Sequence, residues 1–170
     1  LTNKGGLLLA EGKSFEAWQN FDKALEISPN FYLIKNNIAY FLTSYSNNYT
    51  KALELVNKAL DINSENIYSM NTKALALDQT GNHTGALKWY EKVLAKAPKY
   101  IVPLNNKGVA LANLGDYQQA LDWYDKVLKQ VPGDLYMIAN KARILGVNLD
   151  NYTDALKLIS PGHRVFIHGG

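Results

Sequence analysis

A repeat of 34 residues constrains the fold of this chain more than any other feature of its sequence. The segment Asn106–Leu111 (NKGVAL) aligns with Thr72–Leu77 (TKALAL), and 34 residues separate the two segments. The same offset relates Pro98 to Pro132. A period of this length is typical of solenoids, in which each repeat is one supersecondary unit that buries its apolar face only by stacking on its neighbours.

The repeat extends over most of the chain, and its matches weaken toward both ends. Ala17-Trp18 and Ala52-Leu53 take the same place upstream, and Ala155-Leu156 takes it downstream. One residue is inserted in the turn around Ser46–Asn48. We therefore expect about four and a half to five units in a single array, at 1–31, 32–66, 67–100, 101–134 and 135–160, followed by a non-repeat tail at 161–170.

Each unit has the pattern of two helices. In the unit 101–134, Leu104, Gly108 and Leu111 recur at helical spacing in the first half. In the second half the recurring residues are Tyr117, Ala120, Leu121, Tyr124, Val127, Leu128 and Val131. Gly115-Asp116 predicts the tight turn between the helices, and Pro132-Gly133 predicts the end of the second one.

These residues carry a family resemblance. A 34-residue unit with small residues at its eighth and twentieth positions, an aromatic at the twenty-fourth and a proline at the thirty-second resembles the tetratricopeptide repeat (TPR). The resemblance implies an all-α, right-handed α-solenoid of stacked antiparallel helix pairs. Two positions depart from the consensus: position four is Met70 or Leu104, and position seven is Lys73, Lys107 or Lys141. A lysine there can lay its stem on apolar surface and keep its charge in water.

The resemblance also implies that the first helices of successive units line a concave inner surface, with positions two, five, six, nine, twelve and thirteen facing inward. These positions share one helix face, away from the core positions four, eight and eleven. In this chain they hold asparagines and tyrosines with few charges: Asn3, Leu33, Asn36, Asn37, Tyr40, Tyr68, Asn71, Thr72, Leu75, Asp78, Gln79, Asn105, Asn106, Val109, Asn113, Tyr136, Asn140 and Arg143.

A rank of asparagines is suited to binding an extended peptide. Each amide offers donors and an acceptor, so it can pair with backbone N–H and C=O groups largely regardless of peptide sequence, while tyrosines add apolar contact. This resembles the asparagine ladder of some superhelical TPR proteins, including the peptide-substrate arm of the protein O-linked N-acetylglucosamine transferases. The alternative is that asparagine belongs to the general consensus at position six, for solubility and local hydrogen bonding.

A second binding mode of the family is not expected here. Chaperone-binding members clamp a C-terminal carboxylate with lysine and asparagine at positions five and nine, and with lysine and arginine at positions two and six two units later. Positions five and nine hold Thr2 and Gly6, Asn36 and Tyr40, Asn71 and Leu75, or Asn105 and Val109, and the later cations are missing. A buried carboxylate would therefore stay uncompensated.

Composition excludes several other classes of function. The 18 basic and 15 acidic residues give a net charge of +3, too small for nucleic-acid binding unless it is clustered. The lysines at position twenty-six (Lys23, Lys58, Lys92 and Lys126) follow Asp22, Asn57, Glu91 and Asp125, which indicates a solvated outer face. The chain has no cysteine and no run of eighteen apolar residues. We expect a soluble, cytoplasmic protein that binds neither nucleic acid nor membrane.

No cofactor, metal or catalytic site is expected. His83 fits an ordinary turn or core edge, and His163 and His168 stand in a Gly/Pro-containing tail without supporting carboxylates. No phosphate loop, nucleophile elbow or paired-carboxylate arrangement stands out. Asp78 and Arg143 are two units apart and do not make an active site. The chain is therefore not expected to be an enzyme.

The ends of the array suggest a segment of a longer protein. The chain does not begin with methionine, its first helix is clipped, and no polar capping helix is visible. Val165-Phe166-Ile167 could be a short strand or a self-binding segment. The main functional hypothesis is a protein–protein interaction module that binds an extended peptide or disordered segment in its groove. A scaffold that self-associates through its uncapped ends and a substrate-recruiting arm of a larger enzyme remain as alternatives.

Overall fold

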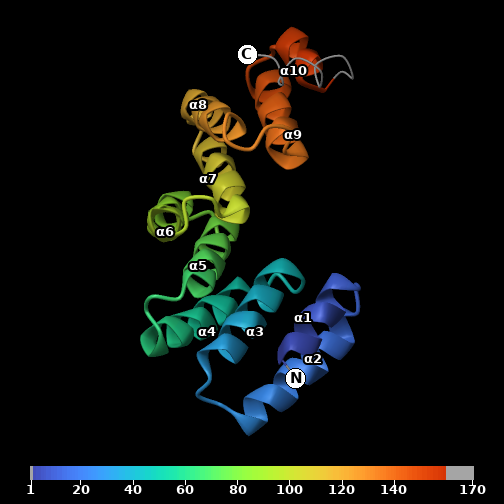
Figure 1. The fold of residues 1–170 in the computed structure, drawn as a ribbon, viewed down its shortest axis with the longest axis vertical. Helices are drawn as coiled ribbons and strands as arrows, with labels where there is room; N and C mark the ends of the chain where they lie inside the picture. The colour runs from blue at the N-terminus through green and yellow to red at the C-terminus, as the bar shows by residue number, and fades with distance from the viewer. Residues whose placement is uncertain (1, 160–170) are drawn as a thin grey trace. The chain divides into compact units, whose positions relative to one another are not determined.

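All regular elements of the described chain are helices (Figure 1). The structure is a computed structural model that describes residues 2–159, with side chains from Lys4 onward. The helices are α1 (Thr2–Ala10), α2 (Ser14–Ile27), α3 (Tyr32–Ser44), α4 (Tyr49–Ile62), α5 (Ile67–Gln79), α6 (His83–Lys96), α7 (Ile101–Asn113), α8 (Tyr117–Leu128), α9 (Leu135–Arg143), the π-helix η1 (Ile144–Asn148) and α10 (Tyr152–Ile159). The predicted tail at 161–170, with Val165-Phe166-Ile167, His163 and His168, lies outside the described residues.

The helices pair as hairpins inside two compact units, one ending at Pro98 and one beginning at Lys99. In the first unit α1 packs on α2, α3 on α4 and α5 on α6, and the first helices of these pairs also contact one another, α1 with α3 and α3 with α5. In the second unit α7 packs on α8 and α9 on α10, and α7 contacts α9. Within each unit, therefore, the first helices form one layer.

Small residues at the eighth position of the repeat let an aromatic ring reach the backbone of the first helix. A Cβ added to Gly108 would lie 2.4 Å from Cζ of Tyr124, and one added to Gly5 would lie 2.4 Å from Cε1 of Phe21. Both rings are fully buried, as is Tyr90 at the same position of its repeat. In the α1–α2 and α7–α8 hairpins the core thus depends on close approach of a ring on the second helix to the backbone of the first.

The turns inside the hairpins use left-handed backbone. Gly12, Gly81 and Gly115 have φ of 75°, 82° and 85°, a region that costs glycine nothing because it has no Cβ. Asn47, in the turn with the inserted residue, and Asp150 both have φ of 52°. Asparagine and aspartate are the side chains that tolerate this region best. The insertion is therefore absorbed in a turn and leaves the helices intact.

The second helix of the fourth pair ends earlier than the apolar spacing predicted. Helix α8 ends at Leu128, so Val131 lies beyond it, in a turn where its N–H donates to the carbonyl of Val127. The ring of Pro132 disfavours helical backbone in Val131, and residues 129–130 already form a turn. The apolar side chain of Val131 is still half-buried, which explains why it fits the periodic pattern.

None of the helices in residues 2–159 is long and apolar enough to cross a membrane.

Candidate functional site

The residues predicted to face a ligand divide into two groups by burial. The side chains of Asn36, Asn71, Thr72 and Asp78 are buried, with 2–6% of their surface exposed. The half-buried and exposed members are Leu33, Asn37, Tyr40, Tyr68, Leu75, Gln79, Asn105, Asn106, Val109, Asn113, Tyr136, Asn140 and Arg143, which we call the asparagine face. The side chain of Asn3 lies outside the described residues. The asparagine face is carried in each unit by the layer of first helices.

Adjacent asparagines at positions five and six pair in the same way in both units. The Nδ2 group of Asn36 donates to Oδ1 of Asn37 at 3.4 Å, and that of Asn105 donates to Oδ1 of Asn106 at 3.5 Å. The position-six oxygen is therefore engaged inside the chain. The Nδ2 donors of Asn37 and Asn106 make no hydrogen bond in the described part of the chain, so they remain for a ligand.

In the second unit a side-chain hydrogen bond joins position six of one repeat to position five of the repeat before it, and the equivalent bond from Thr72 to Asn36 is missing in the first unit. Asn140 donates from Nδ2 to Oδ1 of Asn105 at 3.0 Å. The corresponding residue in the repeat after Asn36 is Thr72, whose hydroxyl donates to the carbonyl of Tyr68. Oδ1 of Asn36 is consequently buried without a hydrogen-bond partner among the described residues. Asn36 and Thr72 thus contribute to packing between helices and do not present a polar group to solvent.

A cavity of about 240 Å³ opens beside Asn37 in the first unit. It is lined by Gly6, Leu9 and Ala10 of α1, Phe21 of α2, Asn37 and Tyr40 of α3, and Tyr45, which follows α3. All its lining residues are uncharged. The cavity therefore suits an uncharged side chain of a ligand, and Asn37 forms part of its wall. The sequence did not indicate that Phe21 and Tyr45 would lie here.

Asp78 is engaged inside the chain. Its Oδ1 lies 2.6 Å from Nδ1 of His83, the first residue of α6, and its side chain is 5% exposed. Because Asp78 lies in the last turn of α5, this contact connects α5 to α6 across the turn between them. The sequence singled out both residues separately but did not pair them, since their spacing of five residues spans a turn whose shape is not readable from periodicity.

Tyr124 joins the two helices of the α7–α8 pair. Its hydroxyl donates to the carbonyl of Asn105 at 3.2 Å, and its ring is fully buried. Burial raises the pKa of the Tyr124 phenol above its ordinary value of 10.0, against smaller opposing effects of the Arg143 charge and the Asn140 amide. The folded state thus favours the neutral phenol, whereas the unfolded state ionises near pH 10.

We therefore expect Tyr124 to make its full contribution to the free energy of unfolding below pH 10. That contribution should fall as the pH rises above 10. The loss is about 1.4 kcal/mol per pH unit for one tyrosine. Urea unfolding of wild type and Tyr124→Phe at pH 9, 10 and 11 measures it, because the difference between the two proteins should narrow with pH. Tyr136→Phe, at a side chain that is 78% exposed, is the control and should follow wild type.

In residues 2–159, His, Asp and Glu side chains gather nowhere in a group of three that could hold a metal ion.

Comparison with known proteins identifies the family. Models described as "Tetratricopeptide repeat" match residues 44–101 and residues 102–134, which together are more than half of the chain. The chain belongs to the tetratricopeptide repeat family. The predicted all-α solenoid of stacked helix pairs is thereby confirmed. As a TPR protein it is a protein–protein interaction module. No curated protein sequence matches it.

Solved TPR structures share the fold at low sequence identity. A TPR protein from Parabacteroides merdae is 22% identical with a TM-score of 0.78; the match covers 93% of this chain and 61% of that one. PilF from Pseudomonas aeruginosa is 20% identical with a TM-score of 0.77, over 99% of this chain and 75% of the other. YrrB, described as a TPR protein with an unusual peptide-binding site, is 21% identical with a TM-score of 0.67, over 98% and 84%. This chain therefore spans about three fifths of the Parabacteroides merdae protein.

Proposed function

We propose that this TPR protein binds an extended peptide or a disordered segment of a partner protein on its asparagine face. The observation that carries the proposal is the combination at Asn37. Its Oδ1 is engaged by Asn36, its Nδ2 donor is unused within the described chain, and it lines a cavity with uncharged walls. A peptide carbonyl can accept from Nδ2 while an uncharged side chain of the peptide enters the cavity.

The second unit supports the same role. Asn106 has an unused Nδ2 donor in the same arrangement, and Tyr136 is 78% exposed on the neighbouring first helix. Exposed tyrosines supply large contact area at low cost in conformational entropy. YrrB, which is described as a TPR protein with an unusual peptide-binding site, shares this fold. This likeness supports peptide binding as a function of the present array. Repeated amide donors recognise backbone, so the peptide sequence would be selected mainly by the cavity.

Isosteric removal of the Asn37 donor tests the proposal. Peptides are selected from a random phage-displayed library on the wild-type chain, and one selected peptide is synthesised with a fluorescent label. Asn37→Asp keeps the shape and the acceptor for Asn36 but replaces the free donor by a second oxygen, so a bound carbonyl loses its partner. We expect the affinity to fall by about tenfold or more in fluorescence anisotropy.

The control is Asn30→Asp, which makes the same chemical change at an exposed residue in the turn between α2 and α3, outside the asparagine face. It should bind the selected peptide as wild type does. Selection that enriches no peptide, or equal affinity of wild type and Asn37→Asp, would refute peptide binding at this face. Circular dichroism of each variant checks that helix content is unchanged.

Self-association is the second candidate, and one observation favours it. Helix α10 exposes Tyr152, Leu156 and Ile159, each with 58–62% of its surface accessible in the structure. An apolar helix face of this kind is typical of a surface that stacks on a neighbour. A molar mass that rises with protein concentration in light scattering would favour a scaffold built by end-to-end contact.

A further inference from the structure

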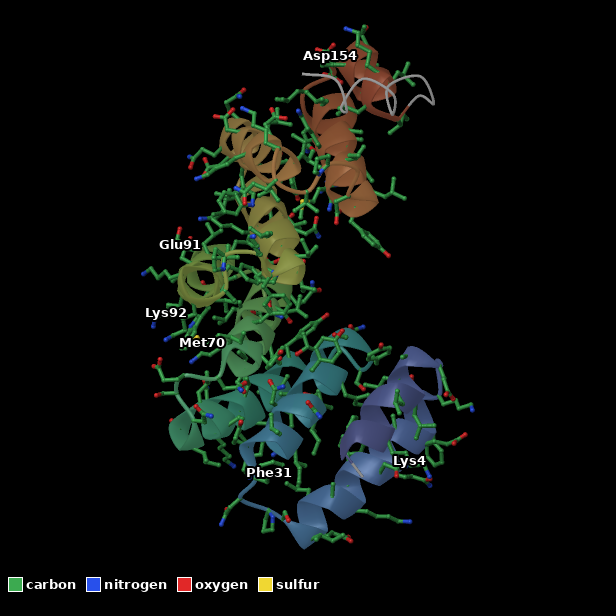
Figure 2. The ribbon with its side chains drawn as sticks, in the orientation of Figure 1. Lys4, Phe31, Met70, Glu91, Lys92 and Asp154 are labelled. Atoms are coloured by element: carbon green, nitrogen blue, oxygen red, sulfur yellow. The ribbon has the colours of Figure 1, made fainter. Side chains whose placement is uncertain are left out.

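Two lysines converge on one tryptophan in the first unit. Nζ of Lys73 on α5 lies 4.4 Å from the ring centroid of Trp89, and Nζ of Lys92 on α6 lies 4.3 Å from the same centroid (Lys92 is labelled in Figure 2). In the second unit the equivalent tryptophan, Trp123, has one ammonium over its ring, that of Lys107 at 4.4 Å. The position-seven lysines are therefore held by cation–π contact, which explains how the repeat accepts lysine there.

The position-seven lysine has a second kind of partner later in the chain. Nζ of Lys141 forms an ion pair with the carboxylate of Asp125, which lies 16 residues earlier at the end of the preceding repeat. Sixteen residues before Lys73 the chain has Asn57, a neutral residue. Lys73 therefore has a neutral amide, that of Asn57, at the position where Lys141 has the carboxylate of Asp125.

Two ammonium groups therefore gather near one ring, and neither is paired directly with a carboxylate of the described chain. Neither Lys73 nor Lys92 forms an ion pair in the part of the chain that the structure describes. Burial lowers the pKa of Lys73, and the charge of Lys92 lowers it further, while the charge of Asp61 has a smaller effect in the opposite direction. Two ammonium groups near one ring repel each other, and an anion bound close to them would offset that repulsion.

We propose that Lys73, Lys92 and Trp89 form a binding site for the carboxylate of an acidic side chain from a partner protein. Asp125 and Lys141 show, within this chain, how a carboxylate seats on the equivalent lysine. Asn57 carries no charge and is exposed on α4, so a carboxylate of a partner protein can take the place beside Lys73 that Asp125 takes beside Lys141. The site lies on helices α4, α5 and α6 at residues that do not belong to the asparagine face, so it adds a second contact surface for a partner.

A labelled peptide of ten glutamates is the probe, and a peptide of ten glutamines is its uncharged counterpart. In fluorescence anisotropy at low salt we expect wild type to bind the glutamate peptide and not the glutamine peptide. Lys73→Gln and Lys92→Gln should each weaken binding by about fivefold, since each removes one charge-assisted contact. Lys126→Gln, on the exposed surface of α8, removes the same charge elsewhere and should leave the affinity within about twofold of wild type.

Restoring the chain's own carboxylate gives the sharpest result. Asn57→Asp should lower the affinity for the glutamate peptide by about fivefold, because the new carboxylate pairs with Lys73. The same ion pair should raise the melting temperature by about 1–3 °C. Gln119→Glu adds the same charge on α8 and should do neither. The proposal is overturned if wild type does not bind the glutamate peptide, or if Lys126→Gln weakens binding as much as Lys73→Gln. Tighter binding of a ten-nucleotide single-stranded DNA that depends on Lys73 would also overturn it.

Discussion

Replacing Phe21 by alanine lowers the free energy of unfolding by about 3–5 kcal/mol. The ring is fully buried, packs edge-on against Phe41 at 6.5 Å between centroids, and fills the space left by the missing Cβ of Gly5. It is also a wall of the cavity beside Asn37. Truncation therefore removes buried apolar surface and leaves a void that joins a cavity already present. Urea unfolding followed by circular dichroism measures the loss.

Phe15→Ala is the matched control for Phe21→Ala. Both residues lie on α2, but the side chain of Phe15 is 74% exposed. Its truncation should change the free energy of unfolding by no more than about 0.5 kcal/mol. Equal effects of the two substitutions would show that α2 does not pack on α1 and α3 as described.

The second large effect is expected from Gly108→Val, which should cost about 2–3 kcal/mol. Any Cβ at this residue meets the Tyr124 ring at 2.4–2.8 Å, and that ring is fixed by burial and by its hydrogen bond to the Asn105 carbonyl. Alanine occupies the same place at Ala39 and Ala74, so a repeat can adapt to one methyl group. A branched side chain needs more room than that adjustment gives. Thermal and urea unfolding report the loss.

Gly6→Val separates steric conflict from the general cost of valine in a helix. Gly6 is also inside a first helix, and a Cβ added there meets no atom within 4 Å. Valine is no worse than glycine in helix propensity, so this variant should stay within about 0.5 kcal/mol of wild type. Were Gly108→Val as stable as Gly6→Val, close packing of α7 against Tyr124 would be refuted.

Helix pairing and the turn glycines were predictable from the sequence because they depend on local spacing. Apolar residues at helical intervals, with Gly81 or Gly115 between two such runs, specify a hairpin without knowledge of its neighbours. The same locality explains the error at the end of α8. Val131 continues the apolar spacing, but the helix ends at Leu128, and the ring of Pro132 keeps Val131 itself out of helical backbone.

The asparagine face was predictable as a set of positions, but the role of each amide was not. Asn36 and Asn37 are adjacent and chemically identical, yet one is buried and the other half-buried, because successive helix residues point about 100° apart. Which amide oxygen is engaged depends on a neighbour in the next repeat, as the bond from Asn140 to Asn105 shows. The sequence therefore indicated a set of positions, and packing decided which amide atoms at those positions are engaged within the chain.

Contacts between helices also explain the lysines that stand at position seven in place of the consensus leucine. The lysines at position seven and the tryptophans on the second helices were visible separately, but only the folded hairpin brings Lys73 and Lys92 to Trp89. The pairing of Asp78 with His83 likewise depends on the shape of one turn.

The sequence by itself determined the class of this protein: its 34-residue period and small residues at fixed places specify stacked TPR hairpins, because a repeat must pack on its neighbours in one way to bury its apolar face. The tertiary structure alone decided which polar groups remain unsatisfied. Hydrogen bonds and ion pairs form between residues that are distant in the chain, and a residue's type does not state which of its atoms its neighbours already occupy.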